Sequence, residues 1–318
     1  MSDAHVDVVV PVHGGWTFVE RCLESLERQT VPVNVIVVDD VSPDDTLARI
    51  RERFARFTIL ANERNSGFSV SCNRGIRAGR APIVVLLNSD VVAAEDFAAR
   101  MIEAFDASPE SVGSIAPILL SADGTVDSFG VTADVTGAGY VRFHGAEPAR
   151  ADAAAPAPVG PYGAAAGYRR RALDEVGVLD ENIFMYGEEL ELALRLQAGG
   201  WQTRAVPFVA GTHIGGASAG KASSRQLFLS SFGRGYLLRV YGVLRSRHAV
   251  RALASEALVV ALWTFTRRDL VALRGRVAGW RAGKGVSRRR IAPGAADSSI
   301  GFVRGMRMRA PGYWRSGS

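Results

Sequence analysis

Residues 6–12 read VDVVVPV, an almost unbroken apolar run rich in β-branched side chains. Such a run predicts a strand buried on both faces, as in a parallel sheet. Residues 13–15 (HGG) end the run, and residues 18–28 then follow a helical spacing. The apolar face of this predicted helix consists of Val19, Cys22, Leu23 and Leu26.

The same order of strand and helix recurs along the first 105 residues. Apolar runs predict further strands at 33–38, 57–61 and 83–87, and helical patterns predict helices at 46–54, 69–78 and 95–105. This alternation is typical of an α/β fold with a parallel sheet wrapped by helices. Ligands of such sheets bind at the carboxyl ends of the strands, where His13, Asp39-Asp40 and the Asn88–Asp90 segment stand.

The middle of the chain has a weaker pattern. Residues 146–161 are rich in Ala and Pro and are expected to form a flexible loop. Residues 188–196 predict a helix that Gly199-Gly200 ends, and residues 206–209 predict a last strand. A Gly-rich loop (GTHIGGAS, 211–218) follows and contains His213.

Length and charge divide the chain into two parts. A length of 318 residues allows one large α/β domain with an appendage, or two small domains. Residues 221–318 hold 20 Lys and Arg against three Asp and Glu, whereas residues 1–220 hold 18 against 29. A basic tail on an acidic body favours a polyanionic partner, either an anionic membrane surface or a nucleic acid. No nucleic-acid-binding module is recognisable in the tail, and a merely solvated, Arg-rich surface is the alternative.

The tail contains an apolar stretch at 250–266 that Glu256 interrupts. Its uncharged part, 257–265, is too short to span a bilayer. Arginines follow among apolar residues, at 267, 268, 274, 276 and 281. This combination is typical of an amphipathic helix that lies in a membrane interface, and a helical subdomain packed on the core remains the alternative.

Compartment signals are sparse. The two cysteines, Cys22 and Cys72, form no CxxC pair, so neither a zinc site nor a disulfide framework is indicated. The polar residues 1–7 lack the pattern of a secretory signal. We therefore expect a cytoplasmic protein, located at the inner face of the plasma membrane if the tail binds lipid.

No Gly-rich phosphate loop of the GxGxxG or GxxxxGK[ST] kind is present. A diphosphate can instead be neutralised by a divalent metal on carboxylates. Asn88 and Asp90 share one face of an extended chain and offer two oxygen ligands. Taken singly, each of these signals has a plainer explanation. The Asn88–Asp90 triplet could be a turn or a helix cap. Residues 188–191 (EELE) could be a solvated helix face, and His213 could be a loop histidine.

Taken together, the motifs are more specific. In order they are VVVPVHGG, VVDDVSPDDT, NERNSGF with CNRGI, VVLLNSDV, VGVLDENIFMYGEELELALRLQAGGW and HIGGAS. This series resembles the family 2 inverting glycosyltransferases, with a look closest to the bacterial rhamnosyl- and galactofuranosyltransferase-like branch. The resemblance covers roughly residues 7–218. It implies a GT-A fold with a Rossmann-like, mostly parallel sheet flanked by helices. The domain then comprises residues 1–220, with a nucleotide-binding half at 1–110 and an acceptor half at 111–220, before a helical, basic region at 221–318.

The resemblance also implies a donor pocket. Asp40 matches the aspartate that binds the base of the nucleotide, and the backbone near Pro11 lines the same pocket. The full set of expected donor-binding residues is Pro11, Val12, His13, Asp40, Asn65, Gly67, Asn88 and Ser89.

Asp90 matches the metal-binding aspartate of the DxD element, and His213 the histidine that completes the metal site in some relatives. The expected cofactor is Mg²⁺ or Mn²⁺. Asn88 stands where many members have Asp, so one negative charge is missing, although the branch commonly uses NxD.

Glu189 matches the catalytic base, with Glu188 and Glu191 as supporting residues. The family usually has Asp at this position, followed by xD, so this chain departs from the pattern. Glutamate has a similar reference pKa but a longer side chain, and about 1 Å of misplacement can matter greatly. Either the backbone and acceptor have shifted to match, or activity has been lost.

The implied function is transfer of a sugar, with inversion, from a dTDP-, UDP- or similar sugar to a glycan or lipid-linked acceptor in cell-envelope synthesis. One alternative is a catalytically impaired member that acts as a binding partner. Another is a nucleotidyltransferase, but such enzymes carry a Gly-rich basic loop after the first strand, where this chain has VHGGW and no Arg or Lys before Arg21.

Overall fold

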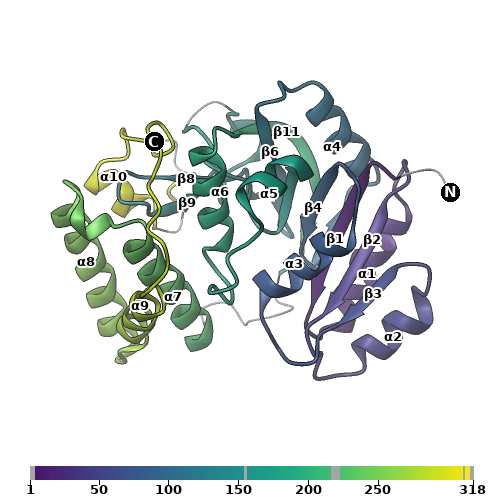
Figure 1. Cartoon of the computed structure of the whole chain (residues 1–318), viewed down its shortest axis with the longest axis horizontal. Coiled ribbons are helices and arrows are strands. Elements are labelled where there is room, and N and C mark those ends of the chain that lie inside the picture. The colour runs from purple at the N-terminus through teal and green to yellow at the C-terminus, as the bar shows by residue number, and fades with distance from the viewer. Residues whose placement is uncertain (1–3, 154–155, 216–222, 311, 316–318) are drawn as a thin grey trace.

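The computed structural model describes residues 4–153, 156–215, 223–310 and 312–315. In these ranges the chain forms a central mixed sheet, helices on both of its faces, and a helical C-terminal region at one end (Figure 1). The strands are β1 (Val6–Val12), β2 (Asn34–Asp39), β3 (Thr58–Ala61), β4 (Ile83–Leu87), β5 (Val91–Ala93), β6 (Val112–Ser121), β7 (Val126–Ser128), β8 (Val131–Ala133), β9 (Gly139–Val141), β10 (Ala165–Arg169) and β11 (Gln202–His213). The helices are α1 (Trp16–Glu27), α2 (Thr46–Arg53), α3 (Phe68–Ala78), α4 (Phe97–Asp106), α5 (Arg170–Val176), α6 (Glu188–Ala198), α7 (Ser224–Val240), α8 (Ala249–Arg267), α9 (Val271–Ala282) and α10 (Phe302–Arg307).

The main sheet has the strand order β3-β2-β1-β4-β10-β6-β11-β5, with β7 paired to β6. Strands β3, β2, β1 and β4 are all parallel, as their continuous apolar runs predict. The second half mixes directions, because β10 runs antiparallel to both β4 and β6 while β11 runs parallel to β6. The predicted α/β class is therefore confirmed, and the parallel pairing dominates its first half.

Two hydrophobic clusters lie on opposite faces of the sheet. One joins alternate residues of β1, such as Val8 and Val10, to α1 and α4. The other joins Val9 of the same strand to α3, α5 and α6. The predicted apolar face of α1 is confirmed, since Val19, Cys22, Leu23 and Leu26 are all buried. Both cysteines are free thiols in these clusters.

The C-terminal helices share a core with the preceding domain. Tyr236 and Leu237 of α7 belong to one hydrophobic cluster with Ile183, Leu190 and Leu194. Helix α7 also packs along α9, and α8 contacts α9. Residues 224–307 are thus built onto the second half of the sheet domain (Figure 1).

The strand predicted at 206–209 is longer in the structure. It extends from Gln202 to His213 and carries β-bulges where its register against β6 shifts. Residues 146–161 are expected to be a loop, and their described part contains one short 3₁₀ turn, Pro148–Arg150, and an isolated β-bridge from Gly160 to Val131.

Candidate functional site

A pocket of about 650 Å³ opens at the carboxyl ends of β1, β2 and β4. This volume is typical of a small-molecule site. Its lining includes nearly all of the residues that the sequence predicts for the donor, metal and base, namely Pro11, Val12, His13, Asp40, Asn65, Gly67, Asn88, Ser89, Asp90, Glu188, Glu189 and His213. Segments up to 200 residues apart in the sequence thus meet in one cavity.

Asp40 organises one end of the pocket. Its Oδ1 accepts hydrogen bonds from the Asn62 side chain and the Ser66 N–H, both at 2.8 Å, and its Oδ2 accepts from the Gly67 N–H at 2.7 Å. The buried carboxylate therefore fixes the loop that leads into α3. The His13 ring donates from Nδ1 to the Asp40 carbonyl at 2.8 Å, which places the imidazole beside the same loop.

The neighbouring Asp39 has a separate role. It is buried, and its carboxylate accepts hydrogen bonds from the side chain and the N–H of Ser42. The Ser42 hydroxyl also accepts a hydrogen bond from the Gly14 N–H. Asp39 thus holds the two strand-end loops together and does not line the pocket, whereas Asp40 does.

Asp90 and His213 both line the pocket and lie in direct contact. The His213 Nε2 is 3.0 Å from the Asp90 Oδ1, and its Nδ1 is 2.8 Å from the Asp127 Oδ2. Burial alone would lower the pKa of His213, but the hydrogen bonds to Asp127 and Asp90 outweigh it and raise the pKa to about 10. The contact follows from the pairing of β11 with β5, which places His213 opposite Val91.

This donor set fits a divalent metal ion. Asp90 offers a carboxylate oxygen, and His213 offers its Nε2 nitrogen once a bound cation replaces the proton that the two carboxylates stabilise. Asp127 stands behind the imidazole, as the carboxylate partners of metal-bound histidines do. Among the described residues no group of three or more His, Cys, Asp or Glu side chains is arranged to hold a metal, so a bound ion would also need ligands from its substrate or from water.

Glu189 occupies the first turn of α6, at the other side of the pocket. The turn before it is unusual, because Tyr186 has a positive φ of 71° and Gly187 a φ of 101°. A non-glycine residue in this region is strained, and such strain concentrates at functional sites. The Glu189 Oε2 accepts a hydrogen bond from the Gly187 N–H at 3.2 Å, which directs the carboxylate back toward the turn.

Burial perturbs both glutamates at the start of α6. It raises the pKa of Glu188, and the adjacent charge of Glu189 raises it further. Burial also raises the pKa of Glu189. The Glu188 Oε2 is buried without a hydrogen-bond partner in the described part of the chain, and its charge acts on the Cys72 thiol. A raised pKa on a carboxyl that lines a pocket is typical of groups that take up protons in catalysis.

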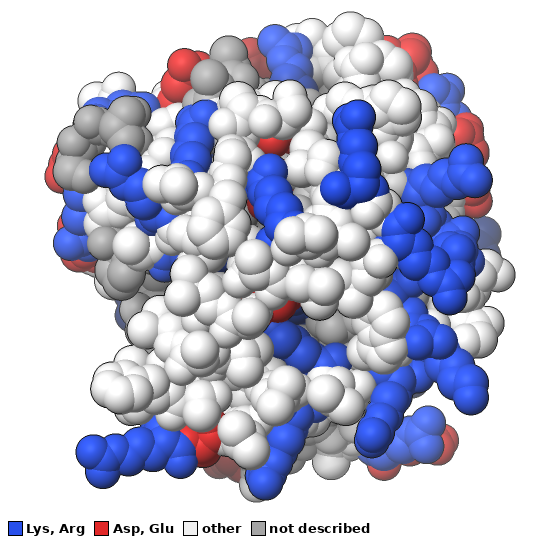
Figure 2. All heavy atoms as spheres, turned by 90° about the vertical axis from the view of Figure 1, so that its left-hand side faces the viewer, with Lys and Arg blue, Asp and Glu red and all other residues white. Residues whose placement is uncertain are grey.

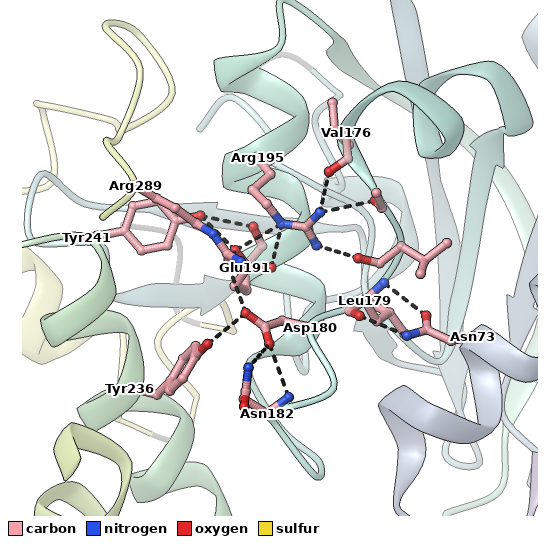
Figure 3. Close-up of polar contacts among 12 residues, drawn as sticks. Asn73, Val176, Leu179, Asp180, Asn182, Glu191, Arg195, Tyr236, Tyr241 and Arg289 are labelled. Atoms are coloured by element: carbon pink, nitrogen blue, oxygen red, sulfur yellow. Dashed lines mark hydrogen bonds and ion pairs between the residues drawn. The ribbon is translucent and has the colours of Figure 1, made fainter. Parts of the chain in front are cut away.

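The structure does not bring Glu191 into the pocket. Its side chain is fully buried on the opposite side of the helix, where Arg195, Arg289 and Tyr241 bind it (Figure 3). Of the two residues expected to support the base, Glu188 lines the pocket, whereas Glu191 instead anchors α6 to the C-terminal region.

Several pocket residues were not predicted from the sequence. Asp127 reaches the pocket from the short strand β7. Tyr162 also lines the pocket, and burial, followed by the charges of Asp127 and Glu189, raises the pKa of its hydroxyl. Arg225 comes from the first turn of α7, with its guanidinium 5.7 Å from the centre of the Phe184 ring. Part of the Gly-rich loop, residues 216–218, lies outside the described residues.

Comparisons with known proteins agree with this geometry. A sequence profile of the family described as "Glycosyl transferase family 2" matches residues 7–177, more than half of the chain. The chain is 28% identical over 251 residues to the N-acetylglucosaminyl-diphospho-decaprenol L-rhamnosyltransferase of Mycobacterium tuberculosis, covering 71% of this chain and 81% of that protein. It is 32% identical over 107 residues to the putative glycosyltransferase EpsH of Bacillus subtilis, and this match spans 32% of the chain but only 30% of EpsH.

Among solved structures, the fold is similar to that of the mannosyltransferase PcManGT from Pyrobaculum calidifontis in complex with GDP-Man and Mn²⁺. The TM-score is 0.53 at 16% sequence identity, with 88% of this chain and 86% of that chain covered. This likeness confirms the predicted GT-A fold.

Proposed function

Because the chain belongs to glycosyltransferase family 2, we propose that its pocket transfers a glycosyl group from a nucleotide-sugar to an acceptor hydroxyl, with Glu189 as the catalytic base. One observation carries this proposal. The Asp90–His213 pair and the Glu189 carboxylate line the same cavity, so a site for an anionic leaving group and a proton acceptor face one bound substrate.

The nucleotide is proposed to bind at the end of the pocket that Asp40 organises. Asp40 fixes the loop before α3, and Pro11, His13 and Asn65 line the surface beside it. The Asp40 carboxylate already accepts three hydrogen bonds within the protein, so its contribution to donor binding includes shaping this loop.

Asp90 and His213 are the residues that would hold Mn²⁺ or Mg²⁺, with Asp127 orienting the imidazole. The ion, when bound, neutralises the negative charge that develops on the diphosphate leaving group. The relative PcManGT, whose structure contains Mn²⁺ and GDP-Man, supports a divalent metal for this chain.

Glu189 is proposed to remove the proton from the acceptor hydroxyl as that oxygen attacks the anomeric carbon. Attack from the face opposite the diphosphate forms the new glycosidic bond while the old bond breaks, which inverts the configuration. Burial raises the pKa of Glu189, so its carboxylate is a stronger proton acceptor than an exposed glutamate.

The mycobacterial relative is named for rhamnosyl transfer to a diphospho-decaprenol acceptor, which supports a deoxyhexose donor and a lipid-linked acceptor for this chain. The exposed Arg225 also lines the pocket and is suited to bind a phosphate of such an acceptor.

A second candidate is a member that binds a nucleotide-sugar without transferring it. The observation that favours it is glutamate at the base position, since its side chain is longer than the usual aspartate. The two candidates agree on donor binding and differ only in turnover.

The test is nucleotide release by the purified protein from dTDP-rhamnose, UDP-galactofuranose, GDP-mannose and UDP-hexoses, each with Mn²⁺, Mg²⁺ or EDTA. We expect release from one donor, loss of release in EDTA, and strong reduction in Asp90→Asn. Glu189→Gln should abolish release while the donor still binds by calorimetry. Binding without release in the presence of candidate acceptors, by the native protein, would support the second candidate. No binding of any donor would contradict both.

A further inference from the structure

Helix α8 exposes a continuous apolar stripe along its outer face. At helical spacing, Val250, Leu253, Leu258, Leu262 and Phe265 all point to solvent. Val250 is 80% exposed, Leu262 56% and Phe265 85%. Alanines at 254, 257 and 261 are exposed between them, so this side of the helix carries no charge from residue 252 to residue 266. Soluble monomers seldom leave such a patch uncovered without a partner for it.

The opposite face of α8 is fixed to the protein. The buried carboxylate of Glu256 accepts hydrogen bonds from Arg234 of α7 and Arg276 of α9, both at 2.7 Å. Burial alone would raise the pKa of Glu256, but the two guanidinium groups outweigh it and lower the pKa to about 2. Glu256 is therefore ionised and held at two points, which orients the helix along the protein surface.

By length and composition α8 could cross a membrane, since an 18-residue window within it has a mean hydropathy of 1.4. This window is longer than the uncharged stretch at 257–265. Crossing would place the Glu256 ion pairs in hydrocarbon, or would break them, and both are costly. The anchored face favours a helix that lies on a membrane over one that spans it.

Neighbouring elements extend the apolar surface. Leu270 precedes α9, Leu273 and Val277 lie on it, and Phe302 and Val303 begin α10. All five side chains are more than a third exposed. We call the surface formed by the exposed apolar side chains of α8 and these five residues the apolar face.

The C-terminal region that forms the apolar face also carries many exposed basic side chains. The exposed set is Arg245, Arg247, Arg268, Arg274, Arg281, Lys284, Arg288, Arg290, Arg307 and Arg309. Within the described ranges none of these forms an ion pair with an acidic side chain, and residues 221–318 contain only three acidic residues to neutralise them. Figure 2 looks onto this end of the molecule and shows uncharged surface with Lys and Arg around and across it and little acidic surface.

We propose that the apolar face, together with the exposed basic side chains of the same region, binds the surface of an anionic lipid bilayer. Apolar side chains that enter the headgroup region and arginines that contact lipid phosphates are the two components of interfacial binding. The inference goes beyond glycosyl transfer and does not depend on it. If both hold, the enzyme would meet a lipid-linked acceptor at the membrane, because α7 packs on α9 and its first turn, with Arg225, lines the pocket.

Other partners fit this surface less well. A nucleic acid would use the arginines but would leave the central Leu, Val and Phe side chains without an apolar partner. A second copy of this chain would bring two strongly basic regions together, which like-charge repulsion opposes. An anionic bilayer satisfies both the charge and the apolar area.

The experiment is flotation of the full-length protein with vesicles of phosphatidylcholine alone, or of phosphatidylcholine with phosphatidylglycerol, at low and high salt. We expect binding to the anionic vesicles, weakened by salt, and little binding to the neutral ones. The double variant Arg274→Glu/Arg281→Glu should bind at least about 25-fold more weakly, because each basic residue near an anionic surface contributes about fivefold. The variant Leu262→Glu/Phe265→Glu should lose at least about tenfold.

Arg51→Glu is the matched control, because Arg51 is an exposed arginine at the end of α2 and lies outside the face. It should bind as the native protein does. Circular dichroism and melting curves establish that each variant is folded, which is expected for such exposed positions. The vesicle readout is independent of catalysis, so loss of transferase activity would not obscure it.

Three results would overturn the proposal. The first is no binding of the native protein to anionic vesicles at low salt. The second is unchanged binding by Leu262→Glu/Phe265→Glu. The third is a dimer in sedimentation that this variant dissociates, which would assign the apolar face to a second copy. Binding of a DNA duplex without binding to vesicles would count as the first of these.

Discussion

The guanidinium of Arg289 donates to the Asp180 carboxylate at 2.8 Å and also pairs with the fully buried Glu191 (Figure 3). Arg289 follows α9, whereas Asp180 lies in the loop that leads toward α6 and Glu191 lies on α6 itself. The hydroxyl of Tyr236 also donates to Asp180, at 2.8 Å. The basic C-terminal region thus fixes the helix that presents Glu189 to the pocket.

Arg289→Ala should lower the stability of the whole chain. It leaves Asp180 with Tyr236 and Asn182, and Glu191 with Arg195 and Tyr241, so both carboxylates keep partners. We expect a loss of about 2 kcal/mol, below the 3–5 kcal/mol typical of a fully buried pair that is broken. Urea unfolding measures this loss. The adjacent, exposed Arg290→Ala should cost less than about 0.5 kcal/mol, and an equal effect of the two substitutions would contradict a specific role for Arg289.

Gly233→Ala should impair catalysis through the turn before Glu189. A Cβ at Gly233 would come to 2.1 Å from the Tyr186 carbonyl oxygen, so α7 or the strained turn must move. A shift of about 1 Å can reduce a rate by about 100-fold, and we expect kcat to fall by that order with little change in donor affinity. Gly301→Ala is the control, since a Cβ there has open space. Native turnover in Gly233→Ala would show that the turn tolerates the shift.

The paired glutamates predict the dependence of transfer on pH. Burial raises the pKa of Glu189 above its ordinary value of 4.5, so the base becomes protonated, and kcat/KM falls, as pH decreases through a value above 4.5. The two carboxyls titrate as a coupled pair, so Glu188→Gln, which leaves a single carboxyl, should shift this acidic limb. Pre-steady-state rates between pH 4.5 and 8 measure the limb. If the limb lay at the same pH in both proteins, the titration of Glu189 would not depend on the Glu188 carboxyl.

Glu188 also predicts a dependence of stability on pH. Its pKa is raised in the folded state, so its contribution to stability is fully present below the unfolded pKa and is lost as pH rises through the folded pKa. Glu188→Gln should therefore be more stable than the native protein at pH 8, with a smaller difference at pH 5. Unfolding free energies at the two pH values test this, and a destabilised variant at pH 8 would indicate that the Glu188 charge has a partner in the fold.

Much of this architecture is predictable because it rests on local patterns. The apolar runs of β1, β2 and β4 specify parallel strands, and parallel strands bring their carboxyl ends to one edge, so Asp40 and Asp90 are expected at the same edge of the sheet, where both line the pocket. His13 and Asn88 follow from the same rule. The strand ends alone therefore place part of this end of the pocket, whereas Asn65 and Gly67 were expected only from the family resemblance.

The rest depends on contacts between distant residues. Asp127 stands in the three-residue strand β7, which has no periodic pattern, and only the pairing with β6 brings it to His213. The family resemblance implies a supporting role for Glu191 at the site, but Arg289, 98 residues away, pairs with it in the interior instead. Arg225 reaches the pocket only because α7 shares a core with α6.

Asp127→Asn should weaken binding of Mn²⁺ without removing a proposed ligand. The Asp127 carboxylate orients the His213 ring and increases its basicity, and such outer partners typically contribute 10- to 100-fold in metal affinity. Titration with Mn²⁺ monitored by electron paramagnetic resonance measures the affinity directly. Asp123→Asn is the matched control, as Asp123 is an exposed carboxylate of the same pocket whose partner is Thr125. Equal affinities for Mn²⁺ in the native protein and both variants would show that Asp127 does not contribute to metal binding.

Glu189→Asp tests whether this chain is adapted to its unusual base. The resemblance to family members implies aspartate at this position, and the shorter side chain would withdraw the carboxylate by about one bond length, or about 1.5 Å. The Glu189 carboxylate is directed by the Gly187 N–H and by a turn in which Tyr186 and Gly187 both have positive φ, so the backbone is set around the longer side chain. We therefore expect kcat to fall by about 100-fold, with donor affinity unchanged and an acidic limb still present, because a carboxylate remains. Glu189→Gln should lose the limb along with the residual rate. If Glu189→Asp were as fast as the native protein or faster, the turn would not be matched to glutamate, and the base position would tolerate either acid.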